Sequence, residues 1–152
     1  MIENSEMFLR LVLAFIAGGL IGLERELVHR PAGIRTHMLV CLGACIFGLM
    51  TNTILPNENA RIVAGVATGI GFLGAGTIFK SKSDVHGLTT AASIWTTAAV
   101  GLGRAFGLYA LAFISVILVL IILNLKVLTK KLSNKEYLLR WNTQMTRQRL
   151  ER

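Results

Sequence analysis

Charged side chains are scarce in this sequence. Only 16% of its 152 residues are Asp, Glu, Lys or Arg, and 53% are hydrophobic, whereas a typical soluble domain carries about 25% charged residues. This composition excludes an ordinary soluble domain, because too little polar surface is present to face water. We expect the all-α class: a polytopic membrane helix bundle of about five transmembrane helices in residues 1–125, followed by a basic amphipathic tail in residues 126–152.

Cysteines and acidic residues are also few. Cys41 and Cys45 stand one helical turn apart in an apolar segment, a spacing that suits packing better than a disulfide. The net charge is +8, and eight of the sixteen Lys and Arg lie at or after Lys126. Cationic residues beside apolar spans set topology and contact anionic lipid. We therefore expect no nucleic-acid partner, and a tail that lies on the membrane against anionic lipids.

Motifs for catalysis are missing as well. No Ser/His/Asp set, metal-ligand cluster or phosphate loop stands in a supporting context. The histidines His29, His37 and His86 lack the spacing of metal ligands, and we interpret them as solvated interface residues. The sequence predicts no enzyme, no cofactor and no metal site.

Five apolar segments of helix length follow one another along the chain. The N-terminal residues MIENSE lack the basic region of a cleaved signal, so we expect the first segment to be retained. Arg10 near its start is expected to reach the membrane interface. The expected spans are residues 7–23, 36–55, 61–79, 88–102 and 106–125.

The distribution of Lys and Arg predicts an orientation. With the N-terminus outside and the C-terminus in the cytoplasm, thirteen Lys and Arg fall on the cytoplasmic side and three outside, as the positive-inside rule requires. The loop at residues 24–35 and the hairpin at residues 80–87 then share one face. Ionisable residues at membrane depth pair or line polar cavities. We expect a charged cluster there, made of Glu24, Arg25, Glu26, Arg35, Lys80 and Asp84.

Small and hydroxyl side chains mark the expected contact faces. Glycines let transmembrane helices approach closely, and we expect helix packing at Gly18, Gly22, Gly65, Gly69, Gly71, Gly74 and Gly76. The pattern G-x-G-x-x-G at residues 69–74 lies inside an apolar segment, so it predicts packing and not dinucleotide binding. A polar stripe is expected on the fourth span, as helix–helix hydrogen bonds or as the lining of a pathway: Thr89, Thr90, Ser93 and Thr96.

Four of these blocks also carry a family resemblance. The runs LIGLERE, AGIRT, GIGFLGAG and GLTTAASIW occur in this order at residues 20–26, 32–36, 69–76 and 87–95. They resemble the signature blocks of the MgtC/SapB family of bacterial inner-membrane proteins. The resemblance implies a compact membrane domain of four or five spans, a role in adaptation to low magnesium, and survival of pathogens inside phagocytes. Members of the family have been described as magnesium transporters and as regulators of other membrane proteins, including the proton-translocating ATP synthase.

The chain departs from the family pattern at two places. Longer members carry a soluble C-terminal domain where this chain has its basic tail, so we expect the membrane domain only. Some members have Asn and Cys at the positions of Thr89 and Thr96, so chemistry that needs an amide or a thiol is not expected there.

Two functions are compatible with these patterns. The first is a non-enzymatic regulator that contacts the helices of a partner membrane protein. The alternative is an oligomeric channel or transporter for magnesium or another small ion or polar solute. Five spans are few for a transporter monomer, so that alternative requires a homo-oligomer.

Overall fold

The computed structural model describes residues 3–54, 56–81 and 84–125. Residues 1–120 make one compact unit, and residues 121–152 belong to a second. The expected amphipathic tail, residues 126–152, lies outside the described residues. Its boundary with the bundle therefore stays a prediction.

Helices dominate the described residues, which confirms the all-α prediction. Each apolar run forms one α-helix, and a short two-stranded ribbon joins the third helix to the fourth. In chain order the elements are α1 (Asn4–Leu27), α2 (Ile34–Ile54), the 3-10 helix η1 (Pro56–Glu58), α3 (Asn59–Ala75), β1 (Phe79–Ser81), β2 (Asp84–His86), α4 (Leu88–Ala105) and a fifth α-helix, Tyr109–Leu125.

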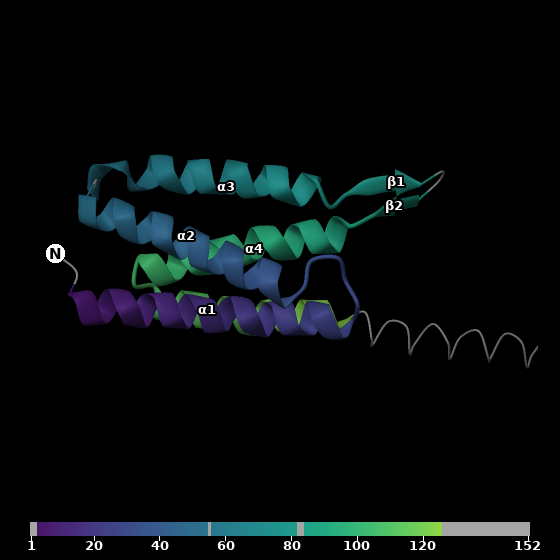
Figure 1. The fold of residues 1–152 in the computed structure, drawn as a ribbon, viewed down its shortest axis with the longest axis horizontal. Helices are drawn as coiled ribbons and strands as arrows, with labels where there is room; N and C mark the ends of the chain where they lie inside the picture. Colours follow the sequence, from purple (N-terminus) through teal and green to yellow (C-terminus); the bar gives the residue numbers. More distant parts are fainter. Residues whose placement is uncertain (1–2, 55, 82–83, 126–152) are drawn as a thin grey trace, which may run out of the picture. The chain divides into compact units, whose positions relative to one another are not determined.

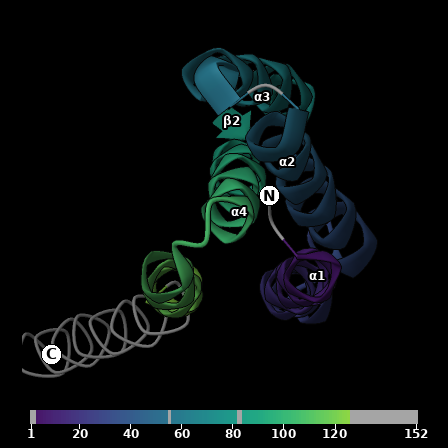
Figure 2. The ribbon, with the colours of Figure 1, turned by 90° about the vertical axis from the view of Figure 1, so that its left-hand side faces the viewer.

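The first four helices run up and down, so that neighbours along the chain are antiparallel (Figure 1). In the end-on view, α2 and α4 lie in the middle, with α1 on one side and α3 on the other (Figure 2). The α1–α2 loop and the β1–β2 ribbon lie at the same end of these four helices (Figure 1). This arrangement follows from the alternation of the spans, and the side of the membrane stays a prediction.

The turn after α1 explains why this helix stops where it does. His29 has a positive φ of 53°, its N–H donates to the carbonyl of Glu26, and the N–H of Arg30 donates to the carbonyl of Arg25. This pair of bonds is the Schellman motif, and a proline commonly follows it. Pro31 does so here, and it prevents the helix from continuing.

The third helix is shorter than expected, because the chain turns before residue 79. The Thr77 hydroxyl donates to the carbonyl of Gly74 at 2.8 Å. Phe79 then enters the ribbon, where it pairs with His86 and stacks on its ring at a centroid distance of 5.3 Å. At the other side of the ribbon, Gly87 has a φ of 89°, and a Cβ there would lie 1.9 Å from the carbonyl oxygen of Thr77. Only glycine fits this junction.

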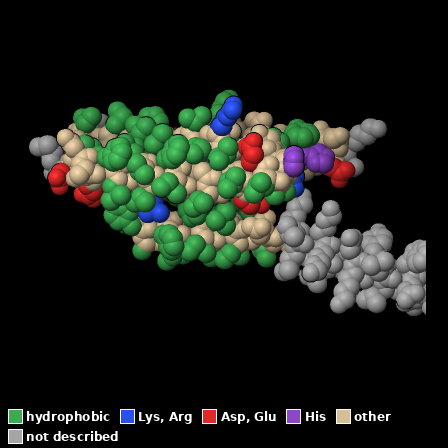
Figure 3. Space-filling model, turned by 60° about the horizontal axis from the view of Figure 1, so that its bottom comes forward, with side chains coloured by type: hydrophobic (Ala, Val, Ile, Leu, Met, Phe, Trp, Pro, Cys, Tyr) green, Lys and Arg blue, Asp and Glu red, His purple; other side chains and the backbone are tan. Residues whose placement is uncertain are grey.

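Large hydrophobic side chains face outward on the helices. Phe72 is 81% exposed, and Phe8 and Leu39 are each 70% exposed. On the face shown in Figure 3, hydrophobic side chains are spread along the whole described part, and charged side chains are few. Soluble monomers rarely carry continuous apolar surface of this kind. α1 and α2 are each long and apolar enough to cross a membrane, and α3 and the fifth helix are apolar but shorter.

Candidate functional site

A buried ion pair lies at the end of α1. Arg25 is 3% exposed, although it stands in the last turn of the helix. Its Nε donates to Glu24 Oε2 at 2.6 Å, and its Nη2 donates to Glu24 Oε1 at 3.1 Å. A forked contact of this kind is the strongest arginine–carboxylate geometry. Both charges of this pair therefore lie within the bundle and not in water.

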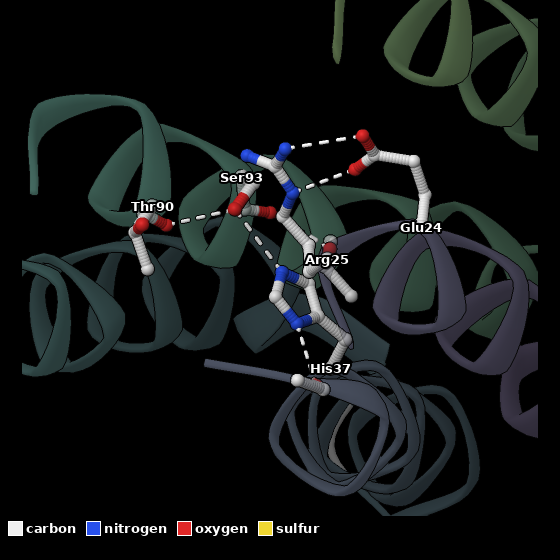
Figure 4. Close-up of polar contacts among 7 residues, drawn as sticks. Glu24, Arg25, His37, Thr90 and Ser93 are labelled. Atoms are coloured by element: carbon white, nitrogen blue, oxygen red, sulfur yellow. Dashed lines mark hydrogen bonds and ion pairs between the residues drawn. The ribbon is translucent and has the colours of Figure 1, made fainter. Parts of the chain in front are cut away.

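His37 lies beside this pair and is fully buried, at 0% exposed. It belongs to the first turns of α2, and Glu24 and Arg25 are near enough to act on it electrostatically. Its Nδ1 lies 2.9 Å from the carbonyl oxygen of Gly33, and its Nε2 lies 3.1 Å from the Ser93 hydroxyl of α4 (Figure 4). The prediction of a solvated histidine is wrong at this position, because α1, α2 and α4 enclose the ring.

The hydrogen bonds of His37 constrain which atoms of the ring and of the Ser93 hydroxyl act as donors. A carbonyl can only accept, so Nδ1 carries a proton. The Ser93 hydroxyl has one proton and two partners: His37 Nε2 and the carbonyl oxygen of Thr90, at 2.8 Å. With a neutral ring, Ser93 donates to Nε2. With a charged ring, Nε2 donates to Ser93, whose proton then goes to Thr90. The same heavy-atom positions are therefore compatible with a neutral or a charged ring.

The expected polar stripe of α4 divides between two faces. Thr90 and Ser93 are 4% and 3% exposed, and Thr97, which widens the expected stripe, is 0% exposed. The Thr97 hydroxyl donates to the carbonyl of Ser93 at 2.7 Å. Thr89 is exposed, and the Thr96 hydroxyl bonds the carbonyl of Ala92 within the same helix. The buried hydroxyl face thus runs through Thr90, Ser93 and Thr97.

The expected charged cluster is only partly assembled. Glu24 and Arg25 form the buried pair, whereas Glu26 Oε2 accepts the backbone N–H of Ile34 at 2.9 Å and caps the start of α2. A Cβ at Gly33 would lie 1.8 Å from that carboxylate oxygen, so the glycine makes room for the cap. The other members are exposed, on α2 and on the ribbon: Arg35, Lys80 and Asp84.

The glycines expected to pack also fall into two groups. Cβ atoms at Gly18 and Gly22 would lie 2.6 Å and 2.5 Å from backbone atoms of His37 and Ile34, so α1 and α2 touch there. Gly74 faces Ala91 of α4 at ordinary contact distance, and Gly76 meets only its own helix end. Within the described part of the chain, nothing lies within 4 Å of a Cβ built on the remaining three: Gly65, Gly69 and Gly71.

Two of these open glycines line a groove between α2 and α3. The groove has a volume of about 590 Å³. Leu39, Gly43 and Phe47 line it from α2, and Gly65 and Gly69 line it from α3, each set spaced about one helical turn apart. It therefore runs along the helix axes. Its lining is apolar apart from Arg61 at the start of α3.

Arg10 does not reach out to the interface as expected. It is 8% exposed. Its guanidinium pairs with Glu6, donates to the carbonyl of Ala105, and donates from Nε to the Tyr109 hydroxyl at 3.2 Å. These partners come from α1, α4 and the fifth helix. One signal for this burial was present in the sequence: Arg10 begins the stripe of small and apolar residues by which α1 packs, which is Ala14, Ala17, Gly18, Ile21 and Gly22.

No group of three His, Cys, Asp or Glu that could hold a metal ion occurs in the described part of the chain. The buried cations Arg10 and Arg25 are paired with Glu6 and Glu24. The apolar exterior and the buried polar core together define a helical membrane protein.

The particular family follows from comparison with known proteins. The chain belongs to the MgtC family, whose sequence pattern matches residues 11–132, so the expected MgtC/SapB membership is confirmed. It is 39% identical over 144 residues to the Escherichia coli K12 protein named "Putative magnesium transporter YhiD", covering 88% of this chain and 67% of that protein.

Two proteins named MgtC are also similar. The one from Brucella abortus strain 2308 is 44% identical over 108 residues, which is 70% of this chain and 45% of that protein. The one from Salmonella typhimurium strain 14028s is 42% identical over 121 residues, which is 78% of this chain and 52% of that protein. The chain thus spans about half the length of these two relatives. No solved structure matches it.

Proposed function

We propose that this chain is a non-enzymatic regulator that acts by helix contact with another membrane protein. Membership of the MgtC family supports a setting in the bacterial inner membrane and in adaptation to low magnesium, stress or the intracellular, virulence-related niche. The proposed orientation keeps the N-terminus outside and the C-terminus in the cytoplasm, and the protein assembles as a homo-oligomer.

The observation that carries this proposal is the α2–α3 groove. Gly43, Gly65 and Gly69 leave its floor free of side chains, and an added Cβ at any of them meets nothing within 4 Å among the described residues. Small residues on a membrane helix are the surface against which a second helix packs most closely. The occupant is a transmembrane helix with small residues on one face. Arg61 lies at the start of α3, and its side chain is 83% exposed. It would contact a carboxylate near the end of the docked helix.

Filling the groove tests this proposal. Gly65→Leu and Gly69→Leu place bulk where the partner helix docks, and Gly71→Leu adds the same bulk to α3 outside the groove lining. In a strain without its own copy, we expect the wild-type chain and Gly71→Leu to restore growth in low-magnesium medium. The two groove variants should fail while reaching the same membrane abundance. Full growth with both groove variants would reject the docking site.

A direct readout uses the buried native thiols. Cys41 and Cys45 are each 0% exposed. In an Arg61→Cys variant, whose thiol lies at the exposed start of the groove, a small maleimide should therefore react with the introduced thiolate alone. A regulated partner, once co-expressed, should slow this labelling. Labelling at an unchanged rate would show that the partner does not cover the groove.

The alternative function is an oligomeric channel or transporter for magnesium or another small ion. One observation favours it: the Glu24–Arg25 pair, His37 and Ser93 form a polar cluster inside the bundle. The name of the E. coli relative points the same way. A bare magnesium site is less compatible with this cluster, because Mg²⁺ prefers carboxylate and water oxygens and Arg25 already occupies the carboxylate of Glu24.

Flux through purified protein in liposomes distinguishes the two functions. Transport of magnesium or protons that falls in Glu24→Gln and in Ser93→Ala would support the transporter. Thr96→Ala is the matched control, because its hydroxyl bonds only the carbonyl of its own helix. Absence of flux from folded protein, together with failure of the groove variants in cells, would support regulation.

A further inference from the structure

Two buried arginines, Arg10 and Arg104, lie near the end of α4, where the chain continues into the fifth helix. Arg10 of α1 donates to the carbonyl of Ala105, the last residue of α4. Arg104 is the residue before it and is 7% exposed. Because Arg10 contacts the carbonyl of the residue that follows Arg104, both arginines belong to one junction of the bundle.

The two arginines differ in the groups that compensate their positive charge. Arg10 has the carboxylate of Glu6 and the hydroxyl and ring face of Tyr109, whose centroid lies 5.8 Å away. Within the described part of the chain, no salt bridge reaches Arg104, and its buried Nε has no hydrogen-bond acceptor. The junction therefore holds two guanidinium groups against one carboxylate.

The structure itself does not supply the missing acceptor. A cation in the last turn of a helix is favoured by the helix dipole, and Arg104 stands in the last turn of α4. A dipole, however, gives no acceptor atom to Nε. The nearby carbonyl of Ala105 already accepts from Arg10 and from the side-chain amide of Asn52, at 3.1 Å. A buried guanidinium without a counter-charge is costly. Nε itself is enclosed, so an anion from outside the described chain would have to balance the charge from the Nη side of the guanidinium.

We propose that Arg104 is a binding residue for a phosphate-class anion, either a phospholipid headgroup or free phosphate. The guanidinium fork matches phosphate oxygens. The site also lies at the correct depth for a headgroup. Arg104 is one residue from the end of α4, and Asn52 is two residues from the end of α2 at Ile54, so the junction stands near the level where the helices leave the hydrocarbon. This site is separate from the α2–α3 groove and does not depend on the regulatory proposal.

The test compares two arginine variants in the full-length protein. Arg104→Gln removes the proposed ligand. Arg61→Gln removes an exposed arginine that is paired with Glu58 at 3.3 Å, and it leaves the basic tail unchanged. Each protein is freed of lipid in a neutral detergent. Its unfolding is then followed while dioleoylphosphatidylglycerol, dioleoylphosphatidylcholine or inorganic phosphate is titrated.

We expect phosphatidylglycerol to slow unfolding of the wild type and of Arg61→Gln more than phosphatidylcholine does. For Arg104→Gln the apparent affinity should fall about tenfold, the loss of one charge-assisted contact. If inorganic phosphate reproduces the effect, the anion is free phosphate. If only the lipid does, it is a headgroup.

Three results would overturn the proposal. The first is equal stabilisation of Arg104→Gln and wild type by phosphatidylglycerol. The second is an equal loss in Arg61→Gln, which would indicate general charge. The third needs no variant: a wild type whose unfolding responds neither to phosphatidylglycerol nor to inorganic phosphate. Arg104→Met, which keeps the apolar stem, replaces Arg104→Gln if that variant does not fold.

Discussion

Gly18 and Gly22 hold α1 directly against the backbone of α2, and this contact gives the sharpest stability prediction. A Cβ at Gly18 would lie 2.6 Å from the carbonyl oxygen of His37 and 2.8 Å from the Cβ of Cys41. A Cβ at Gly22 would lie 2.5 Å from the Cα of Ile34. Real Cβ atoms do not approach this closely, and backbone atoms cannot rotate away. Alanine at either position must push the two helices apart.

Two opposing effects determine the size of this change. Replacing glycine by alanine in a helix gains about 1 kcal/mol in propensity, and overpacking a close contact costs about 1–3 kcal/mol. Because backbone atoms make the clash here, we take the upper part of that range. Gly18→Ala and Gly22→Ala should each lower the free energy of unfolding by about 1–2 kcal/mol. At about 2–4 °C per kcal/mol for a chain of this size, Tm falls by about 2–8 °C.

The matched control is Gly43→Ala on α2, because a Cβ there meets nothing within 4 Å of it in the described residues. It keeps the propensity gain without the clash, so its Tm should stay unchanged or rise. Cys41 and Cys45, each 0% exposed, report unfolding when they react with a thiol-sensitive dye in detergent. A Tm for Gly18→Ala and Gly22→Ala at or above that of Gly43→Ala would refute the contact.

Two further substitutions test the polar core and the start of α2. Ser93→Ala removes the hydroxyl 3.1 Å from His37 Nε2, and an unpaired buried ring nitrogen should cost about 1–3 kcal/mol. Thr97→Val, whose lost hydroxyl bonds only its own helix, should cost less in the same assay, and equal losses would contradict the role of His37. Glu26→Ala removes the carboxylate cap from the N–H of Ile34 and should cost about 1 kcal/mol. Glu26→Gln keeps an acceptor oxygen, so an equal loss in both variants would argue against capping.

The positions of the helices were predictable from the sequence because apolar runs and their breakers are local signals. Pro31 and Gly87 mark the two junctions where the chain reverses near residues 29–33 and 76–87. The alternation of spans also placed the first loop and the ribbon at one end. The early end of α3 was not predictable, because Phe79 is apolar and its stacking on His86 depends on the returning strand.

The buried polar residues were harder to predict, because their partners lie far away in the sequence. His37 and Ser93 are separated by 56 residues, and Arg10 and Tyr109 by 99. No local window contains both members of such a pair. The glycines of α3 illustrate a second limit of prediction from local sequence. Their spacing indicated close packing, but spacing alone does not reveal whether the neighbour belongs to the same chain.

The bundle is packed unevenly, so the two candidate functions depend on different parts of it. α1, α2 and α4 enclose the polar core. Gly74 is the one buried residue among the described residues of α3, and α3 leaves an open groove beside α2. A Cβ added at Gly65 or Gly69 has no described atom within 4 Å, so bulk there should fill the groove and leave the core intact. Ser93→Ala instead changes the core and leaves the groove open. A protein that regulates through the groove should lose activity when Gly65 or Gly69 is enlarged. It should keep activity in Ser93→Ala, provided that this variant folds stably. A transporter that works through the core should show the reverse.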